Sequence, residues 1–127
     1  MEVNAPGVVA EVRAAFERYE RALNLNDVET LNELFWRSPL TIRFGLAENL
    51  YGHDTITAFR RRRPAVDLKR SLVRTAITTY GRDFATANTE LVKQDSGRAG
   101  RQSQTWVRMP EGWRIVSAHV SWYATTP

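Results

Sequence analysis

The most informative part of the chain is residues 101–123, RQSQTWVRMPEGWRIVSAHVSWY. Apolar and polar residues alternate on both sides of a short turn, Pro110-Glu111-Gly112. Alternation with a period of two is typical of strands, because successive side chains point to opposite faces of a sheet. The sequence therefore predicts a hairpin of two strands, 101–108 and 113–123.

The turn also predicts which residues of this hairpin share a face. If Met109 pairs with Gly112, Trp106 faces Ile115, and the alternation can be followed from there. One face then carries Gln102, Gln104, Trp106, Ile115, Ser117, His119 and Ser121. The other carries Arg101, Thr105, Val107, Val116, Ala118 and Val120. We interpret the first face as a pocket wall and expect the second to meet solvent or another subunit.

Further strand patterns precede this hairpin. Residues 72–80 and 84–92 are rich in Thr, Val, Ile and Ala, with Gly81-Arg82 between them at hairpin spacing. Residues 40–44 alternate as well, with Leu40, Ile42 and Phe44 on one side and Thr41 and Arg43 on the other. These patterns predict one more hairpin and a short separate strand.

The first half of the chain instead has helical periodicity. Residues 8–24 place apolar side chains at steps of three and four, which makes one helical face: Val8, Val12, Phe16, Tyr19 and Leu23. A second helix is predicted after Asn26 as N-cap, with Glu29 completing a capping box, and it ends at Ser38-Pro39. A third is predicted over 53–63. Helices first and strands last indicate an α+β class, in one domain over 1–127 with loose ends at 1–7 and 124–127.

Composition narrows the classes of function. The 127 residues have a formal net charge of +4, are 43% hydrophobic and contain no cysteine. Such a chain is typical of a single globular domain, without a disulfide framework, thiolate metal site or cysteine nucleophile. We find no secretory signal and no apolar run of about 20 residues, so we expect a cytoplasmic protein without membrane contact.

The basic residues are almost all arginine: of 18, only Lys69 and Lys93 are lysine. Arginine pairs bidentately with carboxylates and phosphates. The arginines therefore either form a surface for a polyanion, or are used singly in salt bridges and in binding a small anionic ligand. The run Arg60–Arg63 resembles a nucleic-acid signature, but consecutive helical residues fan out by about 100°. We expect Arg61 and Arg62 to be solvated or ion-paired and Arg60 to point to a cavity, and we predict no nucleic-acid partner.

Two residues stand out as candidates for chemistry. Arg43 lies between Ile42 and Phe44, and burying it requires an anion, either a ligand or a protein carboxylate such as Glu48 or Glu90. Tyr19 lies in the apolar stripe of the first helix, where its hydroxyl needs a partner. The partner is either a backbone carbonyl, if Tyr19 is an ordinary residue at the edge of the core, or a substrate.

The remaining candidates are weaker. His119 is either a general base or a neutral hydrogen-bonding histidine, and Trp106 is either core or a stacking wall. Gln102, Gln104 and Ser121 line the pocket only in the register given above, and Asn49 caps or orients a loop. No metal site, cofactor motif or serine nucleophile elbow is recognisable, so we expect no metal, no cofactor and no covalent intermediate.

Several short motifs, in order, make the chain similar to a known family. The closing strand, Trp113 to Ser121, resembles that of the NTF2-like superfamily, and the other motifs resemble its AtzH-like branch, which includes oxalurate catabolism proteins. These other motifs are Ile42-Arg-Phe-Gly45, Glu48-Asn-Leu-Tyr-Gly52, Phe59-Arg-Arg-Arg62, Gly100-Arg-Gln-Ser-Gln-Thr-Trp106 and Gly112-Trp-Arg-Ile-Val116.

The resemblance implies a cone, in which three N-terminal helices pack on a strongly curved, mostly antiparallel sheet. It also implies a homodimer formed through the sheet and a link to amidase gene clusters. The activity proposed for the branch is decarboxylating amide hydrolysis, which converts 1,3-dicarboxyurea into allophanate. Its proposed catalytic residues correspond to Tyr19 and Arg43.

Three hypotheses about function follow. The first is a decarboxylating amidohydrolase for a small anionic, carboxylated urea, with Tyr19 and Arg43 catalytic and the other candidates binding substrate (Asn49, Arg60, Gln102, Gln104, Trp106, His119, Ser121). The second is a non-catalytic binding module or accessory partner of an amidase. The third is a polyanion binder, which would lose affinity steeply with salt.

Overall fold

The computed structural model describes residues 1–124. The first half of the chain forms three helices and two short strands, in the order α1 (Pro6–Asn24), α2 (Val28–Leu34), β1 (Ile42–Phe44), β2 (Asn49–Tyr51) and α3 (His53–Arg62). Four long strands follow: β3 (Arg70–Tyr80), β4 (Phe84–Lys93), β5 (Ala99–Met109) and β6 (Gly112–Trp122). The predicted α+β class is confirmed, and the strand β2 is an addition to the prediction.

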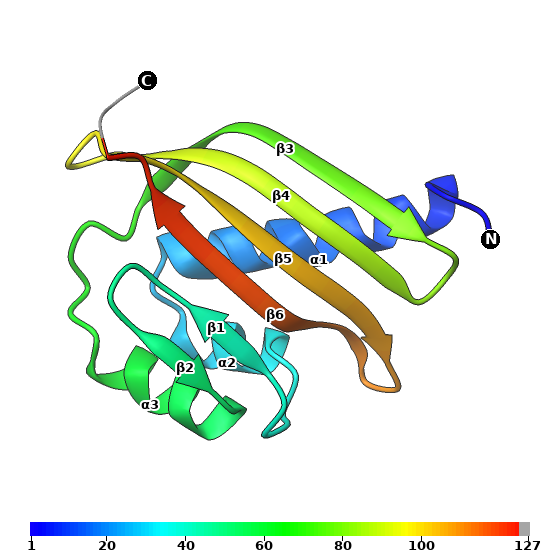
Figure 1. Ribbon diagram of the computed structural model, residues 1–127, viewed down its shortest axis with the longest axis horizontal. Helices are drawn as coiled ribbons and strands as arrows, with labels where there is room; N and C mark the ends of the chain where they lie inside the picture. The colour runs from blue at the N-terminus through cyan, green and yellow to red at the C-terminus, as the bar shows by residue number, and fades with distance from the viewer. Residues whose placement is uncertain (125–127) are drawn as a thin grey trace.

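The strands form one mixed sheet in the order β2-β1-β6-β5-β4-β3. All neighbours are antiparallel except β1 and β6, which are parallel. Figure 1 shows α1 crossing one face of the long strands, with α2 and α3 gathered beside the short strands β1 and β2. The helices therefore cover one face of the sheet, and a site between the layers draws side chains from both.

The predicted register of the last hairpin is correct near the turn and wrong beyond it. Met109 pairs with Gly112 and Trp106 with Ile115, but a bulge at Val116 then pairs Thr105 with Ser117. One extra residue reverses the alternation of the rest of the strand. Ala118 and Val120 consequently share the helix-covered face with Gln102 and Gln104, whereas Ser117, His119 and Ser121 lie on the opposite face.

Two further predictions are corrected, one at the start of α2 and one at the start of the chain. Asp27, rather than Asn26, caps α2, and its carboxylate accepts a hydrogen bond from the backbone N–H of Thr30 at 3.2 Å. The chain start is not loose, since the Asn4 side chain accepts from the Thr79 N–H and Val3 bridges to Tyr80. Of the end predicted to be loose, residues 125–127 lie outside the described part.

The core lies between α1 and the sheet. The apolar stripe of α1 is buried as predicted, against residues of the long strands that include Ile77, Ala85, Ala87, Trp106, Trp113 and Ile115. Trp106 is fully buried in this core. No helix of the described residues is long and apolar enough to cross a membrane.

Candidate functional site

A cavity of about 250 Å³ lies between the C-terminal half of α1, the end of α3 and the helix-covered face of the sheet. Its lining combines apolar and charged side chains: Tyr19, Leu23, Arg43, Leu46, Glu48, Phe59, Arg63, Val66, Asp67, Leu68, Arg70, Lys93, Arg98, Gln102, Val120 and Trp122. Of the nine residues predicted for the site, the lining contains Tyr19, Arg43 and Gln102. Cations outnumber carboxylates in this lining, so the cavity suits an anionic ligand.

Tyr19 projects from α1 toward this cavity and is almost completely buried. Its hydroxyl oxygen accepts a hydrogen bond from the Gln102 amide nitrogen at 3.4 Å. Burial alone would raise the pKa of the Tyr19 phenol, but the charges of Arg60, Arg70 and Arg43 and the bond from Gln102 outweigh burial and lower it. A phenol with a lowered pKa is a stronger proton donor than an ordinary tyrosine.

Arg43 is buried because β1 directs this residue toward the helices, whereas Ile42 and Phe44 are only partly buried. Its guanidinium donates to Glu48 at 3.1 Å and lies 5.3 Å from the centre of the Phe59 ring. The protein carboxylate anticipated for Arg43 is therefore Glu48, and both residues line the cavity. Gly45 permits the pair, since a Cβ at this position would collide with the Glu48 carboxylate.

Arg60 does not belong to the lining of the cavity, which corrects the prediction that it points into it. Its guanidinium is stacked 4.5 Å from the centre of the Phe35 ring, and its three nitrogens are buried without a hydrogen-bond partner among residues 1–124. Burial lowers the pKa of Arg60 to about 10, so this side chain remains a cation at neutral pH. It therefore adds positive charge beside the Tyr19 hydroxyl.

The other arginines of the run behave as their helical positions predict. Arg61 is exposed and pairs with Glu29 at 3.4 Å, and Arg62 is exposed to solvent. Arg63 is partly buried over the Phe59 ring at the cavity. The run is thus divided among a buried cation, a cavity wall and two surface positions.

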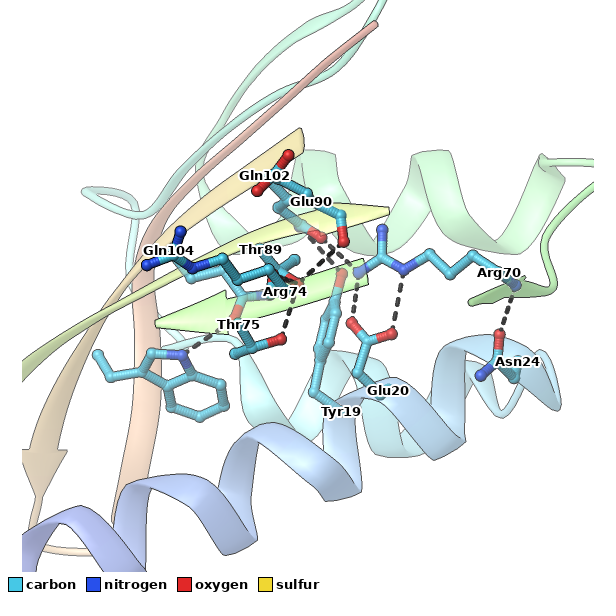
Figure 2. A network of polar contacts seen from close by, with 11 residues as sticks. Tyr19, Glu20, Asn24, Arg70, Arg74, Thr75, Thr89, Glu90, Gln102 and Gln104 are labelled. Atoms are coloured by element: carbon cyan, nitrogen blue, oxygen red, sulfur yellow. Dashed lines mark hydrogen bonds and ion pairs between the residues drawn. The ribbon is translucent and has the colours of Figure 1, made fainter. Parts of the chain in front are cut away.

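A buried ion pair beneath the cavity was not predicted. Arg70 donates to both carboxylate oxygens of Glu20 and also, at 2.5 Å, to the Gln102 side-chain oxygen (Figure 2). Burial alone would lower the pKa of Arg70, but the hydrogen bonds and charge of Glu20 outweigh burial and raise it. The signal for Glu20 was its spacing, because it follows Phe16 by four residues and precedes Leu23 by three, in step with the buried stripe.

The part of the lining around Trp122 was not predicted either. The Lys93 ammonium and the Arg98 guanidinium lie 5.3 Å and 5.2 Å from the Trp122 ring. A side chain at Gly100 would collide with this ring, so the glycine of the 100–106 motif lets Trp122 lie across the strands. Burial, followed by the charge of Arg70, lowers the pKa of Lys93.

The remaining predicted site residues lie away from the lining. Gln104 and Trp106 are buried next to it and are joined by a hydrogen bond of 3.0 Å from the indole nitrogen, so Trp106 is core. Asn49 is exposed on β2. His119 packs edge-on against Phe44, with ring centres 5.7 Å apart, on the outer face of the sheet. Ser121 lies on that same face and accepts from Arg101 at 3.1 Å.

Comparison with known proteins assigns the chain to a family. The AtzH-like family model matches residues 1–126. The chain belongs to the AtzH-like family. No protein of curated function matches it. Two of the motifs quoted for this family contribute to one cavity. Arg43 of the Arg-Phe-Gly strand and Gln102 of the 100–106 motif both line it.

Solved structures agree with the family assignment. A crystal structure of a protein of unknown function from Pectobacterium atrosepticum is 56% identical, covers 96% of this chain and 95% of its own, and superposes with a TM-score of 0.93. A cystatin-like fold protein from Burkholderia xenovorans is 51% identical, with 99% coverage of both chains and a TM-score of 0.93. An NTF2-like superfamily protein from Salmonella enterica is 29% identical over 95% of this chain and 94% of its own, with a TM-score of 0.72. The NTF2-like fold is therefore shown.

Proposed function

We propose that this AtzH-like protein binds a small carboxylated urea such as 1,3-dicarboxyurea and releases one carboxylate as CO₂, leaving allophanate. The observation that carries the proposal is that Tyr19 and Arg43, both buried residues, line the same cavity. A phenol among cations can donate a proton, and a guanidinium can hold a carboxylate. The family resemblance supports the same pair of residues.

The charge of the cavity supports a substrate with two negative groups. Glu48 and Asp67 are the carboxylates of the lining, against five cationic side chains, Arg43, Arg63, Arg70, Lys93 and Arg98. Among residues 1–124, the Arg43 side chain donates one hydrogen bond, to Glu48. A guanidinium has five N–H donors, so Arg43 keeps donors for a ligand carboxylate while it holds Glu48.

The proposed step is proton transfer coupled to loss of CO₂. Tyr19 donates its proton to the nitrogen that carries the departing carboxylate, and the nitrogen–carbon bond breaks with its electron pair staying on nitrogen. The dianion thereby takes up one proton and yields the allophanate monoanion and CO₂. Arg43 stabilises the remaining carboxylated end, a role in which a fixed donor contributes about 3–4 kcal/mol. A proton from solvent then restores the Tyr19 phenol.

The test is turnover of 1,3-dicarboxyurea generated in place by an amidase, with allophanate as the measured product. Tyr19→Phe is expected to lower kcat by about 100-fold or more, because it removes the proton donor and little else. Arg43→Ala is expected to raise KM as well. Tyr51→Phe is the matched control, since Tyr51 is an exposed phenol on β2.

Two results would contradict this proposal. Wild-type rates for folded Tyr19→Phe would remove Tyr19 from the chemistry. Binding of substrate by the wild-type protein without any rate above the amidase alone would favour the binding-module hypothesis.

The pH dependence gives a second measurement. A proton donor works only while it is protonated, so kcat should fall as the pH rises through the pKa of Tyr19. Because that pKa is lowered in the folded protein, the loss should begin below the pH at which exposed tyrosines ionise. An alkaline limb at or above the titration of the exposed tyrosines would contradict a proton-donor role.

A further inference from the structure

The orientation of the Gln102 amide is determined by its neighbours. Arginine has donors and no acceptor, so the group of Gln102 that faces the Arg70 guanidinium at 2.5 Å must be its carbonyl oxygen. The amide nitrogen then faces Tyr19 and donates to the hydroxyl oxygen at 3.4 Å. Figure 2 shows these three side chains meeting beside Glu20. The direction of the hydrogen bond follows from chemistry and not from a choice between two amide flips.

Glu20 holds this arrangement in place. Its two carboxylate oxygens accept from the Nε and Nη2 of Arg70, a bidentate pair that fixes the plane of the guanidinium. All four residues that are linked here, Glu20, Arg70, Gln102 and Tyr19, are buried, with at most 7% of each residue exposed. The backbone N–H of Arg70 is also anchored, by the Asn24 side chain at 2.9 Å. Water is therefore largely excluded from the links, and the order of donors and acceptors is stable.

The described neighbours of the Tyr19 hydroxyl are a hydrogen-bond donor and several cations. Gln102 donates to its oxygen from β5, and the aromatic ring of Phe35 lies against its ring at 6.2 Å. The charged groups that act on it are cations: Arg43 of β1, Arg60 of α3, Arg63 just after α3, Arg70 of β3 and Lys93 of β4. No acceptor for the hydroxyl proton is found among residues 1–124.

We infer that Glu20, Arg70 and Gln102 form a positioning relay that keeps the Tyr19 oxygen an acceptor toward the protein, and so directs its proton into the cavity. The same Gln102 N–H stabilises the phenolate after the proton has left. Arg70 and Glu20 act through Gln102 and are positioning residues in this role. The inference rests on the proposed function for the fate of the proton. The effect of Gln102 on the ionisation of Tyr19 can be measured without substrate.

Two substitutions of similar size separate the relay from a structural role. Gln102→Met removes the donor and keeps the bulk, so the phenolate loses its hydrogen bond. Gln102→Glu keeps the pairing with Arg70 but places a second carboxylate oxygen against Tyr19, where it accepts the phenol proton and repels the phenolate. Gln94→Glu is the control, because Gln94 is exposed and undergoes the same change of charge.

The experiment titrates tyrosine ionisation by ultraviolet absorbance and subtracts the curve of Tyr19→Phe, which isolates Tyr19 from the other three tyrosines. In the wild type, the midpoint of Tyr19 should lie below that of the exposed tyrosines. Gln102→Met should move it upward by about one pH unit, a tenfold change in the ionisation constant, and Gln102→Glu should move it further. Gln94→Glu should leave it in place. With substrate, the alkaline limb of kcat should shift with the midpoint, whereas loss of a simple binding contact would change KM alone.

Unchanged midpoints in folded Gln102→Met and Gln102→Glu overturn the relay. Should Gln102→Glu fail to fold, Gln102→Met still decides. A wild-type midpoint above that of the exposed tyrosines overturns the relay without any Gln102 variant. Midpoints that move as expected while no variant changes turnover support the relay and overturn the proposed function, so the two failures are distinguishable.

Discussion

The helix-covered face of the sheet has two ends that share the same strands and the same helix but differ in chemistry. At one end, Phe16 of α1 packs in the apolar core with Trp106 of β5. Farther along the same face, Gln104 and then Gln102 follow on β5, and Tyr19 takes the place of an apolar residue on α1. The bulge of β6 at Val116 lies between these two ends, and beyond it polar side chains replace the apolar ones of the core.

The border between the two ends lies at one hydrogen bond. The Trp106 indole donates to Gln104, whose side-chain nitrogen is buried without a partner among residues 1–124. On the core side stability comes from removing apolar area from water, whereas on the cavity side each buried charge needs a partner. The two ends should therefore respond differently to substitution.

The largest effect on stability is expected at the apolar end. Phe16→Ala removes a buried ring and leaves a cavity, which should lower the free energy of unfolding by about 4 kcal/mol. The Tyr19 ionisation midpoint should change little, because the substitution removes no charge and no hydrogen bond of Tyr19. Urea unfolding and the absorbance titration measure the two quantities. Phe84→Ala is the control, since Phe84 is 43% exposed. Equal losses for the two variants would show that Phe16 is not a core residue.

A somewhat smaller loss is expected at the polar end. Arg70→Met leaves the Glu20 carboxylate buried without its cation, which should cost about 3 kcal/mol in urea unfolding. The double variant Glu20→Leu/Arg70→Met removes both charges and should regain most of that loss. Arg82→Met, at an exposed position, is the control. If the double variant is less stable than Arg70→Met alone, the ion pair does not account for the cost.

The smallest effect is expected at the loop beside Arg43. Gly45→Ala forces the Glu48 carboxylate away from Arg43, and a partly exposed pair of this kind contributes about 1 kcal/mol or less. Because the Glu48 carboxylate is displaced from Arg43 in this variant, the binding of malonate, a small dicarboxylate, should become about threefold stronger as measured by calorimetry. Gly7→Ala is the control, because a Cβ there meets no atom within 4 Å. Unchanged malonate affinity would show that Glu48 does not compete with an anionic ligand.

Local pattern was enough to predict the α+β class, the stripe of α1 that contains Tyr19 and the pairing of the last hairpin near its turn. These features depend on side-chain periodicity and turn geometry within a few residues. The importance of Arg43 was predictable for the same reason, since a cation between two apolar neighbours in a strand requires an anion. Its partner Glu48 is five residues away and was among the carboxylates considered.

Tertiary structure decided what periodicity could not. The bulge at Val116 inverts the alternation of β6 and turns His119 and Ser121 away from the helices, and a single added residue leaves no mark in the pattern. The pair of Glu20 with Arg70 joins residues 50 apart in the chain, so it depends on how α1 crosses the sheet. The cavity end of the molecule is built from such distant contacts, because a buried charge must find its partner wherever the fold brings one close.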